Sequence, residues 1–185
     1  MSYTQLQSDI GSWFARTDLP TATFISLAEQ EMNRTLRLQG MEEISQETPG
    51  SQLDNGLWKL PYPADFLQLK HIERGGDRLE FVSNNQMNVD ADPAYTIADE
   101  SILLAGNDPV DLTYYKSVPV LSDANTTNLF TTLGYDALLY LALDHAANYM
   151  MQPGDYRQKG IERMAEIQQQ DYKAAHSGAP LVQRG

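Results

Sequence analysis

The sequence contains no cysteine. This absence excludes a disulfide framework, cysteine-ligated zinc and a cysteine nucleophile. Long apolar runs are also missing, since no stretch approaches the roughly 18 apolar residues that a membrane span requires. The first residues have neither the basic part nor the apolar part of a signal peptide. We therefore expect a protein without a membrane partner, made as a soluble product in the cytoplasm.

Basic residues are scarce. The chain has 13 Lys and Arg against 25 Asp and Glu, a formal net charge of −12. A chain of this charge is repelled by the phosphates of nucleic acid, which excludes tight duplex binding. No Lys or Arg lies between Arg78 and Lys116, so one surface of the fold is predicted to be strongly negative. The acidic residues of that stretch are Glu80, Asp90, Asp92, Asp99, Glu100, Asp108 and Asp111.

Motifs of catalysis and of cofactor binding are missing as well. The glycines do not fall at the spacing of dinucleotide or phosphate loops, and no serine lies in a nucleophile-elbow context. The histidines are far apart and have no partner three or four residues away. Isolated histidines of this kind are more often surface or core residues than metal ligands. They are His71, His145 and His176.

Three aspartates, Asp90, Asp92 and Asp99, raise the question of calcium. A hand-type loop starting at Asp90 needs Gly at its sixth position and Glu at its twelfth. Tyr95 and Ser101 occupy those positions instead. We therefore interpret these carboxylates as turn residues on a solvated acidic face, and we expect no metal and no cofactor.

Apolar residues at helical spacing predict four helices, over about residues 4–15, 20–38, 135–151 and 155–174. The third of these is apolar nearly all round. A helix with so little polar surface must be buried on several sides, either in the core or between subunits. Gly160, in the fourth helix, costs about 1 kcal/mol relative to alanine, so that helix depends on packing.

Between the second and third helices the apolar spacing changes to that of short strands separated by Gly, Asn, Asp and Pro. Gly75-Gly76-Asp77 is a hairpin turn, and residues 42–55 are a polar connection. The predicted fold is α+β and mainly helical: a four-helix bundle-like core with a small antiparallel β insertion, about residues 56–116, of five or six strands. We expect one domain over residues 1–175 and a flexible tail over residues 176–185.

Several segments, taken in order, resemble a known family. The sequence FISLAEQEMNRTLR begins at Phe24, LPYPADFL begins at Leu60, and YYKSVPVLS begins at Tyr114; Asn128 and the Leu138-Leu139-Tyr140 helix follow. Together they resemble the head–tail adaptors beneath the portal of tailed bacteriophages, such as the tail accessory factor of short-tailed phages. The resemblance covers about residues 4–172 and lies in the order and spacing of the segments.

The resemblance implies a non-enzymatic virion protein at the head–tail junction, assembled in the host cytoplasm. Its partners would be the portal protein, neighbouring copies in a dodecameric ring, and the tail nozzle or tube proteins. DNA would pass through the ring without specific binding. The resemblance also implies a C-terminal segment that reaches along the portal, with Leu181 and Val182 as apolar anchors. An ordinary disordered terminus is the alternative for these residues, and the portal-docking candidates are Pro180, Leu181, Val182 and Arg184.

A conduit should not bind the DNA that passes through it. Many copies of a subunit with a net charge of −12 would line the conduit with negative charge, which repels the phosphates. This hypothesis makes the acidic residues of the β insertion the candidates for the lumen. They are Asp90, Asp92, Asp99, Glu100, Asp108 and Asp111.

Two other functions remain open. The first is a tail-associated peptidoglycan hydrolase, because glycoside cleavage needs only two carboxylates. Glu29, beside the apolar stripe of the second helix, and Glu42-Glu43 would be the candidates, although an acid that forms a surface or inter-subunit ion pair is the simpler interpretation of Glu29. The second is another type of head-completion or tail-tube protein.

Overall fold

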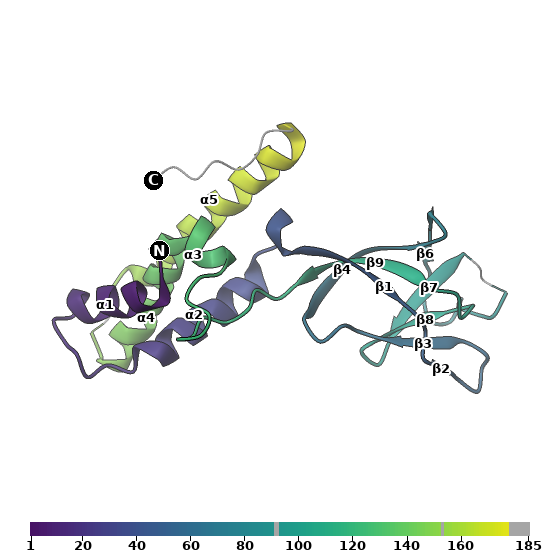
Figure 1. Cartoon of the computed structure of the whole chain (residues 1–185), viewed down its shortest axis with the longest axis horizontal. Helices are drawn as coiled ribbons and strands as arrows, with labels where there is room; N and C mark the ends of the chain where they lie inside the picture. Colours follow the sequence, from purple (N-terminus) through teal and green to yellow (C-terminus); the bar gives the residue numbers. More distant parts are fainter. Residues whose placement is uncertain (91–92, 153, 178–185) are drawn as a thin grey trace. The chain divides into compact units, whose positions relative to one another are not determined.

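The computed structural model describes residues 1–90, 93–152 and 154–177. By its internal contacts the chain forms two compact units, whereas the sequence pattern was interpreted as one domain with an insertion. We call residues 1–41 and those from Val118 onward the helical unit, and Glu42–Ser117 the β unit. Figure 1 shows that the β unit is inserted in the sequence between α2 and α3.

The helical unit contains five α-helices and one short 3-10 turn among the described residues. α3 was not predicted, because five residues are too few for a helical period to show. It is set by a capping box, in which the Asn128 side chain accepts from the Thr131 N–H and the Thr131 hydroxyl accepts from the Asn128 N–H. The elements are α1 (Tyr3–Trp13), α2 (Thr21–Thr35), η1 (Gln39–Met41), α3 (Leu129–Leu133), α4 (Tyr135–Tyr149) and α5 (Tyr156–Ser177).

α4 is the central helix of this unit and contacts α1, α2, α3 and α5 (Figure 1). Most of its apolar side chains are fully buried, among them Leu138, Leu141 and Leu143. Other helices of the same chain therefore bury α4 on several sides, as the sequence predicts. Most of its apolar surface is therefore core and does not have to be covered by another subunit.

α5 packs on α4, and its narrow buried stripe starts at Gly160 and continues through Met164, Ile167 and Asp171. A β-carbon at Gly160 would lie 2.8 Å from Cδ2 and 2.9 Å from Cγ of Leu141. The two helices therefore approach so closely that the side chain of Gly160 is limited to hydrogen. The other faces of α5 are largely exposed.

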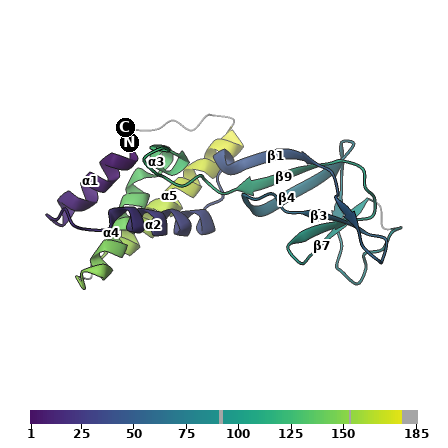
Figure 2. The ribbon, with the colours of Figure 1, turned by 60° about the horizontal axis from the view of Figure 1, so that its bottom comes forward.

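The described residues of the β unit form nine strands in two sheets. One sheet, which we call the first sheet, has the order β1-β9-β4-β5, and the second has the order β2-β3-β8-β7-β6. Figure 2 shows β1, β9 and β4 lying side by side. The strands are β1 (Glu42–Glu47), β2 (Ser51–Gln52), β3 (Trp58–Pro61), β4 (Phe66–Arg74), β5 (Asp77–Arg78), β6 (Glu80–Phe81), β7 (Ala94–Ala98), β8 (Ser101–Leu104) and β9 (Val110–Lys116).

The β unit has its own core, which takes side chains from both sheets. Ile72 and Leu112 of the first sheet pack with Leu60, Ile102 and Leu104 of the second. Leu103, between the last two in sequence, points to the opposite face and packs with Leu57 and Met87. β8 is thus buried on both faces, and this explains why its sequence reads as a continuous apolar run rather than as an alternation.

The prediction of a mainly helical, four-helix bundle-like core with a small antiparallel insertion is wrong. The chain is α+β: over the residues that the structure describes, the β unit has nine strands in two sheets, and the helical unit has α3 in addition to the four longer helices. The β region begins at Glu42 rather than near residue 56. The sequence does not predict β1, because this strand is polar and resembles a connection. The unit is also not purely antiparallel, since β6 and β7 pair in parallel.

Candidate assembly site

Glu29 of α2 is buried, with 1% of its surface exposed. Its two carboxylate oxygens accept from the Leu121 N–H at 3.1 Å, and one of them accepts from the Asn128 amide at 2.7 Å. Burial raises the pKa of Glu29, while these two hydrogen bonds oppose the rise. The interpretation of Glu29 as a surface or inter-subunit ion-pair acid is therefore wrong, and a carboxylate enclosed in this way does not reach a polymer substrate.

One helical turn after Glu29, Asn33 binds the same chain segment. Its amide donates to the Val118 carbonyl at 3.3 Å, and its side-chain oxygen accepts from the Val118 N–H at 2.8 Å. Residues four apart lie on one face of a helix, so both side chains point at residues 118–121. We call this arrangement the α2 latch. It fixes the segment with which the chain re-enters the helical unit.

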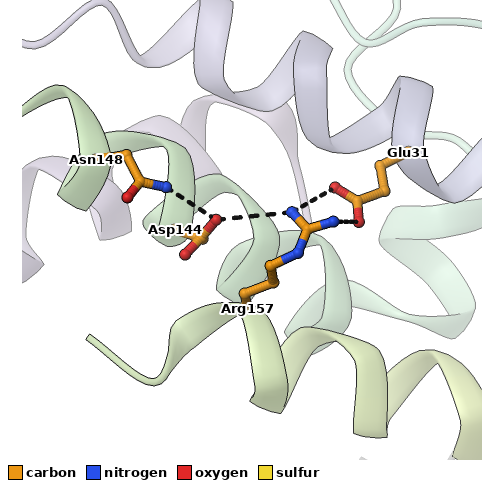
Figure 3. Close-up of polar contacts among 4 residues, drawn as sticks. All are labelled: Glu31, Asp144, Asn148 and Arg157. Atoms are coloured by element: carbon orange, nitrogen blue, oxygen red, sulfur yellow. Dashed lines mark hydrogen bonds and ion pairs between the residues drawn. The ribbon is translucent and has the colours of Figure 1, made fainter. Parts of the chain in front are cut away.

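A second polar cluster joins three helices (Figure 3). The guanidinium of Arg157, on α5, donates to both oxygens of Glu31, on α2, at 2.7 and 3.3 Å. It also lies 3.9 Å from the carboxylate of Asp144, on α4, which accepts from Asn148 at 3.1 Å. A forked guanidinium suits this double contact, because its donors are held in one plane. Arg157 therefore ties the start of α5 to α2 and α4.

An open cleft of about 570 Å³ runs along α1 and the loop that follows it. Hydroxyl side chains dominate its lining, among them Ser8, Ser12 and Thr17, with Gly11 between them. Arg16 also lines it and is held by Asp18. This lining does not supply the paired carboxylates that glycoside cleavage requires.

Within residues 1–90, 93–152 and 154–177, no three His, Asp or Glu side chains gather as they would around a metal ion. His71 lies 3.6 Å from Glu73, and His176 contacts the backbone oxygen of Tyr172. Across the same residues, no helix is both long and apolar enough to cross a membrane.

The whole chain corresponds to one known family: the family model described as SU10 adaptor protein matches residues 1–184. The chain belongs to the SU10 adaptor protein family. This confirms the resemblance to phage head–tail adaptors that the ordered segments indicated, and it gives the chain the structural role of a phage adaptor. Among curated proteins, none matches the chain.

In this SU10 adaptor the negative charge is concentrated in the β unit. Residues 42–117 hold 14 Asp and Glu against five Lys and Arg, which amounts to −9 of the total −12. Asp99 and Glu100 form the two-residue turn between β7 and β8 and are exposed. Asp90 and Asp108 are exposed too, whereas Asp111 is half-buried in β9. Asp92 lies outside the described residues.

The structure does not gather these acids at one point. Asp99-Glu100 precedes β8, and Asp108 follows it, so the two groups lie toward opposite ends of that strand. The turn itself is strained, because Asp99 and Glu100 have φ of 47° and 55°. This left-handed region is favoured by Asn and Gly in two-residue hairpins.

The portal-docking candidates of this adaptor, Pro180, Leu181, Val182 and Arg184, lie outside the described residues. The α2 latch was missed from sequence. The sequence shows only Glu29 beside the apolar stripe of α2 and Asn33 four residues later. That pattern does not tell which backbone groups these two side chains hydrogen-bond.

Proposed function

We propose that this chain is a structural, non-enzymatic subunit of the virion that connects phage head to tail. Copies form a dodecameric ring beneath the portal protein and continue the conduit through which DNA passes to the tail nozzle or tube. The observation that carries the proposal is the SU10 adaptor match over residues 1–184. Assembly takes place in the host cytoplasm, and the mature location is the head–tail junction.

Two features support a structural rather than an enzymatic role. Glu29, the carboxylate that a hydrolase would have used, is enclosed by its own chain and engaged by Leu121 and Asn128. The cleft beside α1 is lined mainly by hydroxyl and small side chains. We therefore expect no clearing of peptidoglycan in a zymogram, and clearing that is lost in Glu29→Gln would contradict the proposal.

The test of the ring is direct. Purified chain is mixed with portal rings, and the product is viewed by electron microscopy and weighed by native mass spectrometry. We expect a stoichiometric second ring on the portal and a dodecamer mass for it. Absence of any complex at micromolar concentrations of both components would overturn the proposal, and an extended tube would favour a tail-tube protein instead.

The acidic residues of the β unit are proposed to face the conduit, where they repel the DNA phosphates. The support is the charge of −9 over residues 42–117 and the exposure of Asp90, Asp99, Glu100 and Asp108. Replacing Asp99 and Glu100 by lysine should make portal-bound rings retain duplex DNA at low salt. The matched pair Gln169→Lys and Gln170→Lys, on the exposed part of α5, should not. A complex in which these acids face outward would exclude this role.

The C-terminal residues Pro180, Leu181, Val182 and Arg184 are proposed to dock on the portal. Deleting residues 176–185 should leave the circular dichroism spectrum and melting temperature of the free chain unchanged, because α5 contributes its buried side chains before that point. The deletion should weaken binding to portal rings at least tenfold. Docking at wild-type strength would reject this role of the segment.

A further inference from the structure

Two chain connections join the β unit to the helical unit. Residues 36–41 lead from α2 into the β unit, and we call them the entry connection. Residues 118–128 lead from the β unit back to α3, and we call them the exit strap. Apart from the 3-10 turn η1, neither of these described segments contains a helix or a strand. Contacts with side chains therefore have to satisfy much of their backbone.

Each connection is held by a buried acid from a helix. In the entry connection, the Gln39 N–H donates to both carboxylate oxygens of Asp171, on α5, at 3.0 and 3.3 Å. In the exit strap, the Leu121 N–H donates in the same way to both oxygens of Glu29, on α2, at 3.1 Å. Both acids are buried. The two N–H groups therefore form a matched pair, on which the two connections can be compared.

The apolar side chains of the two connections differ. The entry connection buries three large side chains almost completely, because Leu36, Leu38 and Met41 are at most 1% exposed. The exit strap buries only Val118 and Leu121, and most of its other side chains are exposed. The stabilisation of a segment grows with the apolar area that it removes from water. The entry connection is therefore anchored in the core, whereas apolar burial holds the exit strap less firmly.

Polar contacts supply much of what holds the exit strap. Asn33 of the α2 latch binds the N–H and the carbonyl of Val118, and the Thr126 carbonyl accepts from the Tyr3 N–H at 2.7 Å. When such a segment opens, water replaces the lost partners, so the net cost of each hydrogen bond is small. Opening also returns the buried carboxylate of Glu29 to water, which removes its cost of desolvation.

We propose that the exit strap opens while the helices, both sheets and the entry connection stay folded, and that the α2 latch keeps the strap closed. In the open state the β unit is held by its entry connection alone. Parts of a protein open at free energies between zero and that of global unfolding, and segments with few buried apolar contacts open most easily. This opening is a property of the single chain and does not depend on the proposed ring.

Native-state hydrogen exchange of the full chain, read by NMR, compares the matched pair of amides. After correction for intrinsic exchange rates, we expect the Leu121 N–H to exchange at least tenfold faster than the Gln39 N–H. The N–H of Leu141, in the buried centre of α4, reports the unfolding of the whole helical unit and should exchange most slowly. Equal protection of Leu121 and Gln39, or exchange of Leu121 at the rate of Leu141, would overturn the proposal.

Two variants separate the latch from the general stability of the helical unit. Asn33→Ala removes two contacts with the strap and should speed the exchange of Leu121 at least tenfold further, leaving the other two amides unchanged. Gln168→Ala is the matched control, since its side chain donates to the Thr35 carbonyl just before the entry connection, at 3.3 Å. It should leave Leu121 unchanged.

The remaining outcomes are decisive as well. If Asn33→Ala speeds all three amides equally, the strap opens only with the whole helical unit, and the proposal is wrong. If Asn33→Ala leaves Leu121 unchanged, the α2 latch does not keep the strap closed, which also overturns it. If Asn33→Ala fails to fold, the comparison of Leu121 with Gln39 in the unaltered chain still decides.

Discussion

Replacing Gly160 by alanine is expected to destabilise the helical unit, although helix propensity alone predicts the opposite. Alanine is favoured over glycine in a helix interior by about 1 kcal/mol. The new methyl carbon, however, would lie 2.8 Å from Cδ2, 2.9 Å from Cγ and 3.4 Å from the backbone N of Leu141. Leu141 is 1% exposed and belongs to the central helix, so it has little room to move.

Forcing an extra methyl group into a packed contact costs about 1–3 kcal/mol. After the gain in propensity, we expect Gly160→Ala to lower the free energy of unfolding by about 1 kcal/mol. Urea unfolding can be followed by the fluorescence of Trp13 in a Trp58→Phe background, which confines the signal to the helical unit. In a Leu141→Ala background, Gly160→Ala should instead be neutral or stabilising, because the obstructing atoms are gone.

A control on the same helix separates propensity from packing. Ala165 is exposed on α5, so Ala165→Gly should cost about 1 kcal/mol through propensity alone. An unfolding midpoint that rises in Gly160→Ala, with Leu141 intact, would refute the close approach of α4 and α5 as the reason for this glycine.

Other predictions concern the latch, the acidic turn and the three-helix cluster. Burial raises the pKa of Glu29 above its ordinary value of 4.5. The contribution of Glu29 to stability should therefore be fully present below pH 4.5 and be lost as the pH rises through the pKa of the folded state. Chemical unfolding of wild type and Glu29→Gln across this range should show a difference in free energy of unfolding that shrinks as the pH rises. Asp99→Asn with Glu100→Gly should stabilise the β unit by about 1–2 kcal/mol and raise its melting temperature, because Asn and Gly adopt the left-handed conformation of this turn with less strain. An unchanged or lower melting temperature would contradict this. Arg157→Met should lower the stability of the helical unit by about 1 kcal/mol, since the pair with Glu31 is half-exposed; calorimetry that shows no loss would mean that solvent replaces the pair.

The longer helices follow directly from the sequence, because α1, α2, α4 and α5 each bury apolar residues at a helical period. The sequence predicts strands β3, β4, β7, β8 and β9 for a similar reason, since turn residues bound each of their runs. β1 was not visible, because an edge strand with exposed Ile44 and three glutamates has no apolar face. The sandwich of two sheets was hidden as well, since strand order depends on pairings distant in sequence.

The polar sites could be predicted less well than the elements. Glu29 is acidic, and acidic residues are rarely buried, so the sequence alone predicts that it lies at the surface. What buries it is the approach of residues 118–128, where the Leu121 N–H and the Asn128 side-chain amide supply the hydrogen bonds. Such a partnership joins positions about 90 residues apart and leaves no periodic signal. The acids of the β unit are visible as composition, and their places at opposite ends of β8 follow from their positions before and after that strand.

The pairing of β1 with β9 has a consequence for the order of folding. Glu42, the first residue of the β unit, is the register partner of Tyr115, two residues before its end, so the entry and exit of this unit lie side by side. While the β unit is unfolded, the helical unit must close a loop over residues 42–117, at an entropic cost on the order of 4 kcal/mol. A folded β unit removes most of that cost, because it delivers its two ends already together. During synthesis, residues 42–117 also emerge before α4 and α5 exist, so folding of the β unit first would bring α2 next to the segment that it must hold.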